Sequence, residues 1–539
     1  MSEQSDFSIS RRRLVQIFAA AGVFAAGGAL GRVIAPATPA LADGQYKDTL
    51  TFAQGSDPTS LDPAYFSDGE SGKVTQLIYE SLVEFAGTGT DIAPGLAESW
   101  DISDDGLTYT FHLRQGVKFH DGSDFTSADV VASLGRQLEE NRNSDMAYAS
   151  FIFGTSEANT GVSTIEATDD HTVVFTLRSA ASPFIKNLAL RLGAPIVSKK
   201  ALDATSDGRL SENPVGTGPY KFVSWTKSDN LQLTRNDDYW DKDNAGKSKS
   251  IVFRFIAENA SRVMSLVNGE VDIIDGIDTT VASTITNSGY TLYAQDGMNI
   301  NYMLFNCDAS QFTSVDARKA VCEAINVPEM VSALYGEYAS VANSVMPEGM
   351  APYVKDITQV SYDADKAKAD LEAAGVKDIH MIAYSNPRPY NTATGQTLAE
   401  SIQGYLAKVG VNVTIDTYDW TTYKQKLNAH DFDIAFNGWS GDNGDPDNFM
   451  NLLADSFEGL NVAHFRDEEY DDLIAKGVTL PDGDERNEVY HRCEQIVAEQ
   501  VPWLVISHAK VLVAYTPKLQ DFEYRIIGET NLAKAQVLA

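Results

Sequence analysis

The spacing of apolar residues predicts short strands and helices from about residue 49 to 300. The run Leu107–Arg114 alternates apolar and polar side chains at the two-residue period of a strand with one buried face. The segment Thr126–Asp129 then has the pattern of a capping box, which predicts the start of a helix. Val130, Leu134 and Leu138 recur every four residues and give that helix one apolar face.

Beyond about residue 300 the pattern changes to alternating helices and strands. A helix is predicted from Asp363 to Ala374, where Gly375 ends it. Another is predicted from Thr397 to Val409, after which alternating Val and Ile residues predict a strand. This alternation indicates a second α/β domain.

The C-terminal run Trp503–His508 is continuously apolar, which predicts a fully buried strand. The last 30 residues are too few to fold alone, so we expect them to return to the first domain.

A predicted strand at Phe432–Phe436 leads into the segment Gly438–Phe449, which combines carboxylates with glycines. The end of this strand brings Trp439 and Asp442 to an edge of the sheet, where α/β proteins usually bind ligands. The chemistry suits a cationic group. The aspartates on either side of Pro446 are interpreted as turn residues.

Composition places the chain among globular proteins of two or three domains. It has 539 residues, of which 43% are hydrophobic and 22% charged. With 42 basic and 75 acidic residues the net charge is -33, which repels nucleic acids and anionic lipids. No nucleic-acid partner is therefore expected, and the favoured interpretation of the charge is a solvated acidic surface.

The N-terminus has the pattern of an export signal. Basic residues in Ser10–Val15 precede the apolar run Ile17–Leu30, and Ala40–Ala42 forms a small-residue cleavage site. The arginines resemble a twin-arginine signal, although Gln16 replaces the usual lysine and a general secretory signal stays open. A run of about 14 apolar residues is short of the roughly 20 that span a bilayer. We expect a mature periplasmic protein that starts at Asp43.

The chain has three cysteines, Cys307, Cys322 and Cys493. None lies near the cleavage site, so no lipid anchor is expected. A bridge between Cys307 and Cys322 is one alternative, and unpaired buried cysteines are the favoured one. No pair has the spacing of a metal site, so neither a metal nor another cofactor is expected.

Several segments together resemble the family 5 solute-binding proteins of ABC importers, which include dipeptide- and oligopeptide-binding proteins. The resemblance extends over nearly all of the mature chain and implies a two-lobed α/β periplasmic binding protein (type II, cluster C-like). The segments are Ala97–Trp100, Asp105–Arg114, Val117–Gly122 and Gly216–Tyr220.

Within that family, Gly438–Phe449 is most similar to the dipeptide-binding branch. The resemblance implies that Asp442 holds the ligand's α-ammonium group and that Arg388, followed by Pro389 and Tyr390, binds its α-carboxylate. Trp439 and Gly438 would line the same pocket, and Ser67 would contribute a hydroxyl from the first lobe.

The charges fit this assignment, because a free dipeptide is a zwitterion whose two ends both need neutralising in a closed cleft. A planar guanidinium can form two charge-assisted hydrogen bonds with a carboxylate. Longer peptides, glutathione, an opine, nickel, haem or an oligosaccharide stay open as ligands of the same scaffold.

A secreted hydrolase is the alternative in kind, because Gly438–Asp442 nearly matches a nucleophile elbow. It fails where Asp442 replaces the last glycine. Two glycines in Asn213–Tyr220 also lack the rest of a nucleotide-binding turn, so ATP hydrolysis is expected in partner subunits. The sequence therefore predicts a binding protein and no enzyme.

The resulting model has an export signal at 1–42, a first lobe at 43–297 completed by 510–539, and a second lobe at 298–509. Two chain crossings form the hinge. The expected partners are a small peptide and the permease subunits of an ABC importer with their ATPases, and the protein itself is expected to be a monomer.

Overall fold

The structure is a computed structural model that describes residues 46–539 with short internal gaps. The gaps fall at 147, 158, 351, 354, 356, 358–359 and 456–459. The predicted export signal and its cleavage site lie outside the described residues.

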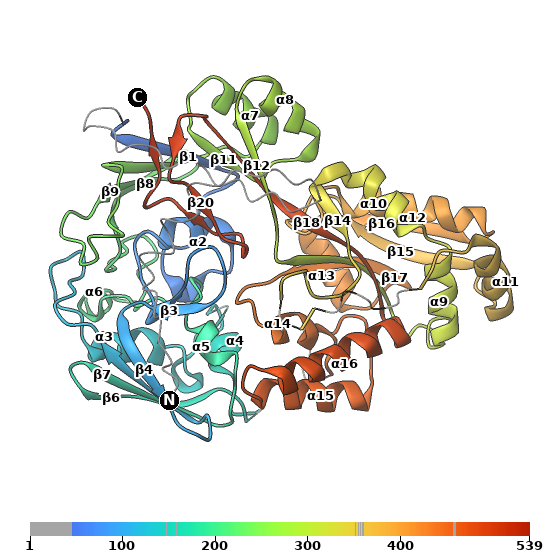
Figure 1. Ribbon diagram of the computed structural model, residues 1–539, viewed down its shortest axis with the longest axis horizontal. Helices are drawn as coiled ribbons and strands as arrows, with labels where there is room; N and C mark the ends of the chain where they lie inside the picture. The colour runs from blue at the N-terminus through green and yellow to red at the C-terminus, as the bar shows by residue number, and fades with distance from the viewer. Residues whose placement is uncertain are drawn as a thin grey trace, which may run out of the picture. The chain divides into compact units, whose positions relative to one another are not determined.

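A twelve-stranded mixed sheet runs through the described chain (Figure 1). Its strands lie in the order β16 (Asn412–Tyr418), β15 (Asp378–Tyr384), β17 (Ile434–Ser440), β13 (Asn299–Phe305), β18 (Trp503–Tyr515), β11 (Ile273–Asp275), β1 (Thr49–Gln54), β10 (Ser250–Phe255), β9 (Asn230–Arg235) and β8 (Tyr220–Thr226). Two further strands, β12 (Thr291–Asp296) and β14 (Ala339–Val341), pair with β18.

Strand β18 is shared by two halves of this sheet. Its C-terminal part pairs antiparallel with β11 and β12, and its N-terminal part pairs antiparallel with β13 and β14. Figure 1 shows β18 in red, running from the elements around β17 to those around β1. We call β1, β8–β12 and residues 510–515 the first half of the sheet, and β13–β17 and residues 503–509 the second half.

The chain crosses between the two halves at two adjacent places. Gly297 and Met298 separate β12 from β13, and β18 crosses between Ala509 and Lys510. Asn299 joins the crossings, because its amide donates to the Ala509 carbonyl at 2.7 Å and its side-chain oxygen accepts from the Ala509 N–H at 2.8 Å. A Cβ atom at Gly297 would lie 2.9 Å from the Ala509 carbonyl oxygen, so glycine permits this close approach.

A separate four-stranded antiparallel sheet contains the predicted strand Leu107–Arg114. Its order is β4 (Ala97–Ile102), β5 (Thr108–Leu113), β7 (Thr172–Leu177) and β6 (Val162–Asp169). Tyr109, Phe111 and Leu113 of β5 are buried and alternate with partly exposed residues, which confirms the one-sided strand. Phe111 packs edge-on against Phe175 of β7, so aromatic pairs form the core of this sheet.

The predicted capping box opens helix α3 (Ser127–Gly135). The Thr126 N–H donates to the Asp129 carboxylate at 2.9 Å, and Val130 and Leu134 are buried. Leu138 was wrongly placed on this helix, which ends at Gly135; a 3₁₀ turn follows Leu138. The spacing of apolar residues does not reveal the end of α3, because Leu138 packs against the same core as Val130 and Leu134 although it lies beyond the helix.

The second half of the sheet carries the predicted αβ alternation. Helix α11 (Ala364–Ala374) begins after Asp363 and ends at Gly375, which adopts a left-handed conformation with φ 74° as predicted. Helix α12 (Gly395–Lys408) begins two residues before the predicted Thr397, because Thr394 caps it through the Thr397 N–H. Helices α9 (Val315–Glu323), α10 (Val327–Tyr335), α13 (Trp420–Asn428), α14 (Asp447–Met450), α15 (Glu468–Thr479) and α16 (Asp484–Gln500) complete this part.

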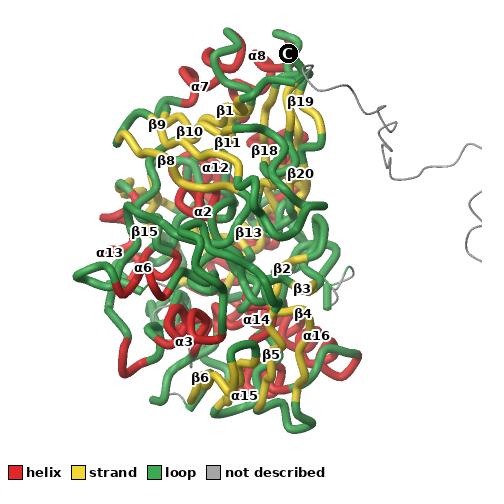
Figure 2. The backbone as a smooth tube through the Cα atoms, turned by 90° about the vertical axis from the view of Figure 1, so that its left-hand side faces the viewer, coloured by secondary structure: helices red, strands yellow, loops and turns green. Residues whose placement is uncertain are grey.

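The first half of the sheet is accompanied by shorter elements. The helices are α2 (Gly69–Thr75), α4 (Ala149–Phe153), α5 (Phe184–Asn187), α6 (Lys199–Asp203), α7 (Asn259–Val267) and α8 (Ala282–Asn287). Three two-stranded antiparallel sheets pair β2 (Val83–Phe85) with β3 (Ile92–Pro94), β19 (Leu519–Gln520) with β22 (Gln536–Val537), and β20 (Glu523–Tyr524) with β21 (Thr530–Asn531). Figure 2 shows β8, β9, β10 and β1 side by side in yellow near the C-terminus.

The C-terminal segment packs on the first half of the sheet. The Lys47 N–H donates to the Val537 carbonyl at 2.8 Å, and the Lys247 N–H donates to the Ala533 carbonyl at 2.8 Å. Leu519 and Leu532 share a core with Phe52 of β1. The terminal residues are therefore part of this core.

The three cysteines are free, so the alternative bridge between Cys307 and Cys322 is absent from the structure. Cys322 and Cys493 are buried in the core of the second half. Burial raises the pKa of the Cys307 thiol to about 11, which keeps it protonated at neutral pH.

The contacts of Arg318 predict a contribution to the stability of the folded protein. Its buried guanidinium donates to the carbonyls of Phe312 at 2.6 Å and Gln500 at 2.7 Å, and so closes the C-terminus of α16. We expect Arg318→Met to lower the free energy of unfolding by about 1–3 kcal/mol, because these carbonyls lose their partner. Urea denaturation of the variant and of the unsubstituted protein measures this difference in the free energy of unfolding.

Arg466→Met is the control for this prediction. The Arg466 side chain is 58% exposed and pairs with Asp308 at 2.8 Å, so its loss should cost about 0–1 kcal/mol. Equal losses in the two variants would contradict a special role for the buried guanidinium.

Candidate functional site

The candidate site lies at the edge of the sheet where β15 and β17 end. These strands run parallel, with Met381 opposite Ile434, so their carboxyl ends reach the same edge. The strand predicted at Phe432–Phe436 begins later, at Ile434, and extends to Ser440 because β13 pairs with all of it. Gly438 and Trp439 therefore belong to a strand, and the connecting loop begins at Gly441.

Asp442 is held by neutral donors at the start of this loop. Its carboxylate accepts from the Tyr148 hydroxyl at 3.2 Å and from the Asn448 amide at 3.4 Å. The Asn448 side-chain oxygen in turn accepts from the Asp442 N–H at 3.0 Å and from the Trp439 indole at 2.9 Å. Burial raises the pKa of the Asp442 carboxyl to about 6, although the hydrogen bonds from Asn448 and Tyr148 oppose the shift.

Arg388 lies in a tight turn after β15. The N–H groups of Arg388 and Asn391 each donate to the other residue's carbonyl, at 2.8 and 2.9 Å. The guanidinium lies over the Trp420 ring, with its central carbon 3.6 Å from the ring centroid. Burial lowers the pKa of Arg388, and its Nε has no hydrogen-bond partner among the described residues.

Tyr390 and Gly438 contact each other directly. The Tyr390 hydroxyl donates to the Asn437 side-chain oxygen at 3.3 Å. A Cβ atom at position 438 would lie 2.2 Å from the Tyr390 ring, so only glycine lets the ring pack here. The contact joins the turn of Arg388 to the strand that leads to Asp442.

The structure thus brings five of the six predicted site residues to one edge. Ser67 is the sixth, and it lies exposed between Tyr65 and α2. No hydrogen bond links it to the other five within the described part of the chain.

A group of contacts that we call the clasp joins the loop after β17 to residues 182–187 around α5. The Asn443 amide donates to the Asn187 side-chain oxygen at 2.7 Å, and both side chains are buried. Lys186 lies 3.5 Å from the Asp445 carboxylate. Nearby, the Ser182 N–H donates to the Val478 carbonyl at 2.9 Å.

Asp445 has two roles. It accepts from the Asp447 N–H at 3.0 Å, as expected of a turn residue. Its fully buried carboxylate also pairs with both terminal nitrogens of Arg486, at 2.7 and 2.9 Å. This charge is thus already neutralised within the protein, whereas Asp442 forms no ion pair with any residue that the structure describes.

Three neighbours of the site, Tyr148, Asn448 and Trp420, were not predicted from the sequence. Asn448 lies inside the segment already singled out. Trp420 follows β16, the parallel neighbour of β15, so the rule that placed Asp442 at this edge also applies to it. Tyr148 is 294 residues from Asp442 and had no such signal.

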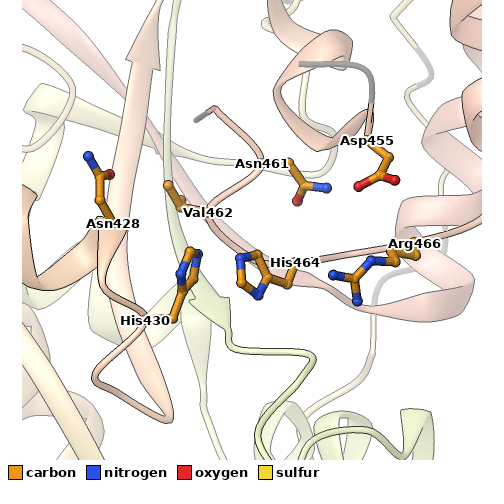
Figure 3. Close-up of a pocket in the computed structure, with 7 residues that line it drawn as sticks. All are labelled: Asn428, His430, Asp455, Asn461, Val462, His464 and Arg466. Atoms are coloured by element: carbon orange, nitrogen blue, oxygen red, sulfur yellow. The ribbon is translucent and has the colours of Figure 1, made fainter. Parts of the chain in front are cut away.

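A surface pocket lies elsewhere, near the other end of β17 (Figure 3). It is lined by Asn428, His430, Asp455, Asn461, Val462, His464 and Arg466. His430 and His464 face each other with ring centroids 3.4 Å apart, and Asp308 accepts from His464 at 2.9 Å. It contains none of the predicted site residues.

Among the described residues, no group of three or more His, Cys, Asp or Glu side chains is arranged to hold a metal ion. No helix in the same residues is long and apolar enough to cross a membrane.

Comparison with known proteins identifies a family. The model of the bacterial extracellular solute-binding proteins, family 5 Middle, matches residues 91–461. Di/tripeptide-binding protein 1 from Pseudomonas aeruginosa (strain UCBPP-PA14) is 31% identical over 526 residues, which cover 94% of this chain and 97% of the relative. Heme-binding protein A from Haemophilus influenzae is also 31% identical, over 88% of this chain and 90% of the relative.

A solved structure has the same fold. It is the ABC transporter-associated periplasmic binding protein DppA from Helicobacter pylori, in complex with the peptide STSA. The two share 30% identity with a TM-score of 0.78, over 92% of this chain and 98% of the other.

The raised pKa of Asp442 predicts a pH dependence of stability in the ligand-free protein. Since the folded carboxyl binds its proton more tightly than the unfolded one, stability should fall as pH rises from about 4, the ordinary value, to about 6, and then level off. Asp442→Asn removes this titration, so its stability relative to the unsubstituted protein should rise over the same interval. Urea midpoints across this range measure the difference.

Asp431→Asn is the control, because Lys426 holds the pKa of the exposed Asp431 carboxyl below its ordinary value. That carboxyl is ionised in the folded protein over the same pH interval, so the stability of Asp431→Asn relative to the unsubstituted protein should not rise with pH. If the relative stability of Asp442→Asn did not rise either, the pKa of the folded Asp442 carboxyl would not be raised.

Proposed function

Because this chain belongs to family 5 of the bacterial extracellular solute-binding proteins, we propose that it captures dipeptides and other short peptides between two lobes for an ABC importer. In this proposal the ligand's α-ammonium binds Asp442 and its α-carboxylate binds Arg388. Tyr390, Gly438 and Trp439 form the wall between them.

One observation carries the proposal. Asp442 and Arg388 have opposite charges at one sheet edge, both are partly buried, and neither forms an ion pair with a described residue. A buried charge without a partner is costly, and most buried charges are therefore paired. A zwitterion would supply both missing partners at once.

Other ligands of the scaffold remain alternatives. The relative named as a heme-binding protein is as similar in sequence to this chain as the di/tripeptide-binding relative is. The solved structure contains the peptide STSA. An oligosaccharide would have little use for the pair of charges. Glutathione and an opine carry charges of their own, so binding measurements have to separate them from peptides.

A secreted hydrolase receives no support from the position of Ser440. This residue is the last of β17 and lies opposite Asn299 of β13. A nucleophile elbow instead places its serine on a sharp turn between a strand and a helix. The family consists of substrate-binding proteins, so the ligand should leave unchanged.

The proposed lobes comprise residues 43–297 with 510–539 and residues 298–509. The change in pairing of β18 between Ala509 and Lys510, next to Gly297, supports these boundaries. With the export signal at 1–42 cleaved after Ala42, the mature protein would act in the periplasm as a monomer and meet the permease subunits, whose ATPases supply the energy.

The first test is isothermal titration of refolded, ligand-free protein with dipeptides and their N-acetylated and C-amidated forms. We expect Asp442→Ala and Arg388→Ala each to weaken binding of a free dipeptide by roughly 10² to 10³-fold or more, since removing one partner of a desolvated ion pair costs about 3–5 kcal/mol. Asp431→Ala, which removes an exposed carboxylate paired with Lys426, is the matched control.

The blocked ligands assign the two charges separately. An N-acetylated dipeptide should lose little further affinity with Asp442→Ala, and a C-amidated one little with Arg388→Ala. Tetrapeptides, glutathione and haemin complete the panel. Binding that ignores both blocking groups, or near-wild-type affinity in either variant, would move the ligand to another chemical class.

Loss of a clasp contact should weaken peptide binding, and the loss should not depend on the side chains of the peptide. In this proposal the clasp forms when the two lobes close, so Asn187→Ala would leave the Asn443 amide without its partner in that form, at a cost of about 1–3 kcal/mol. Affinity should fall by roughly 5- to 150-fold, and by the same factor for every peptide that binds. Titration of two peptides of different side chains measures it.

Asn141→Ala is the control for the clasp, because Asn141 is exposed and lies outside it. Unequal losses for the two peptides would show that Asn187 contacts ligand, and no loss would show that the clasp does not contribute to closure.

A further inference from the structure

A buried polar network lies behind the turn that carries Arg388. The Asn391 amide donates to the Tyr384 hydroxyl at 2.9 Å, and the Asn391 side-chain oxygen accepts from the Tyr335 hydroxyl at 2.8 Å. Asn391 is fully buried, and Tyr335 and Tyr384 are buried as well. Both polar ends of the Asn391 side chain are thus occupied, so the side chain has one orientation.

The network continues to the strands at the chain crossings. The Asn301 amide of β13 lies 3.3 Å from the Tyr335 hydroxyl and 3.3 Å from the Ser507 hydroxyl of β18. At this point the register of β13 against β18 shifts, with Asn301 opposite Ser507 but Tyr302 opposite Val505. Such a bulge re-aims side chains, which lets Ser507 face the network.

The backbone of Asn391 also closes the turn itself. Its N–H and carbonyl form both hydrogen bonds with Arg388, so the position of Asn391 sets where the Arg388 side chain starts. Trp420 then sets the plane of the guanidinium by stacking. The arginine needs such support, because a bidentate contact with a carboxylate requires both the position and the orientation of its fork.

We infer that Asn391 is the positioning residue for Arg388, anchoring its turn through Tyr335 and Asn301 to the two strands at the chain crossings. The inference rests on the proposed function, in which Arg388 binds the ligand's carboxylate. Asn391 itself contacts no ligand in this account. Its contribution passes through Arg388 and therefore concerns only ligands with a free carboxylate.

The experiment compares alanyl-alanine with its C-terminal amide, using competition titration on the mature protein. Asn391→Ala should weaken the binding of alanyl-alanine by about ten-fold or more, which lies within the range of coupling energies between residues of one hydrogen-bond network. The affinity for the amide should change by less than about three-fold. Tyr335→Phe, which removes only the hydroxyl, should give a smaller loss with the same selectivity.

Asn306→Ala is the matched control. Asn306 is also a buried asparagine of the same half and donates to the Phe432 carbonyl at 3.1 Å, near the opposite end of β17. It should lower the thermal midpoint while affecting both ligands equally.

The outcomes separate this inference from the proposed function. If Arg388→Ala makes the two ligands bind alike and Asn391→Ala weakens both equally, the carboxylate site stands and the positioning role is overturned. If the unsubstituted protein binds the acid and the amide alike, the carboxylate site itself is wrong, and the positioning role falls with it. If Asn391→Ala and Tyr335→Phe both lose affinity for alanyl-alanine but not for its amide, the positioning role of Asn391 is established.

Discussion

The sharing of β18 between the two halves of the sheet is the constraint on which the rest of the structure depends. At the point where its partner changes from β12 to β13, Asn299 makes both hydrogen bonds to the backbone of Ala509. Without them, buried backbone groups would stay unpaired at about 1–3 kcal/mol each. The edge that carries Arg388 and Asp442 is placed relative to the first half through this junction.

Asp445 and Asp442 differ in how the protein balances their charges. Asp445 is fully buried and neutralised by Arg486, with Lys186 nearby. Among the described residues, Asp442, three residues earlier, accepts hydrogen bonds from the neutral side chains of Tyr148 and Asn448. Because neither this carboxylate nor the guanidinium of Arg388 forms an ion pair within the described part of the chain, a zwitterionic ligand would gain from both.

Local patterns were sufficient where an element depends on residues close in the sequence. The one-sided strand β5, the capping box of α3 and the glycine end of α11 all follow from side chains within a few positions of each other. The boundaries of β17 did not follow, because its pairing with β13 extends it to Ser440. The end of α3 before Leu138 was also missed, because a residue can pack against the core without belonging to the helix.

The sequence by itself determined the family resemblance and pointed to Asp442, Arg388 and their immediate neighbours, because each lies in a short motif after a recognisable strand. Only the tertiary structure decided what surrounds them. Tyr148 reaches Asp442 across 294 residues, and Asn391 meets Tyr335 across 56. Such contacts depend on how strands and helices pack, and no periodicity or capping rule records which distant side chains share a buried volume.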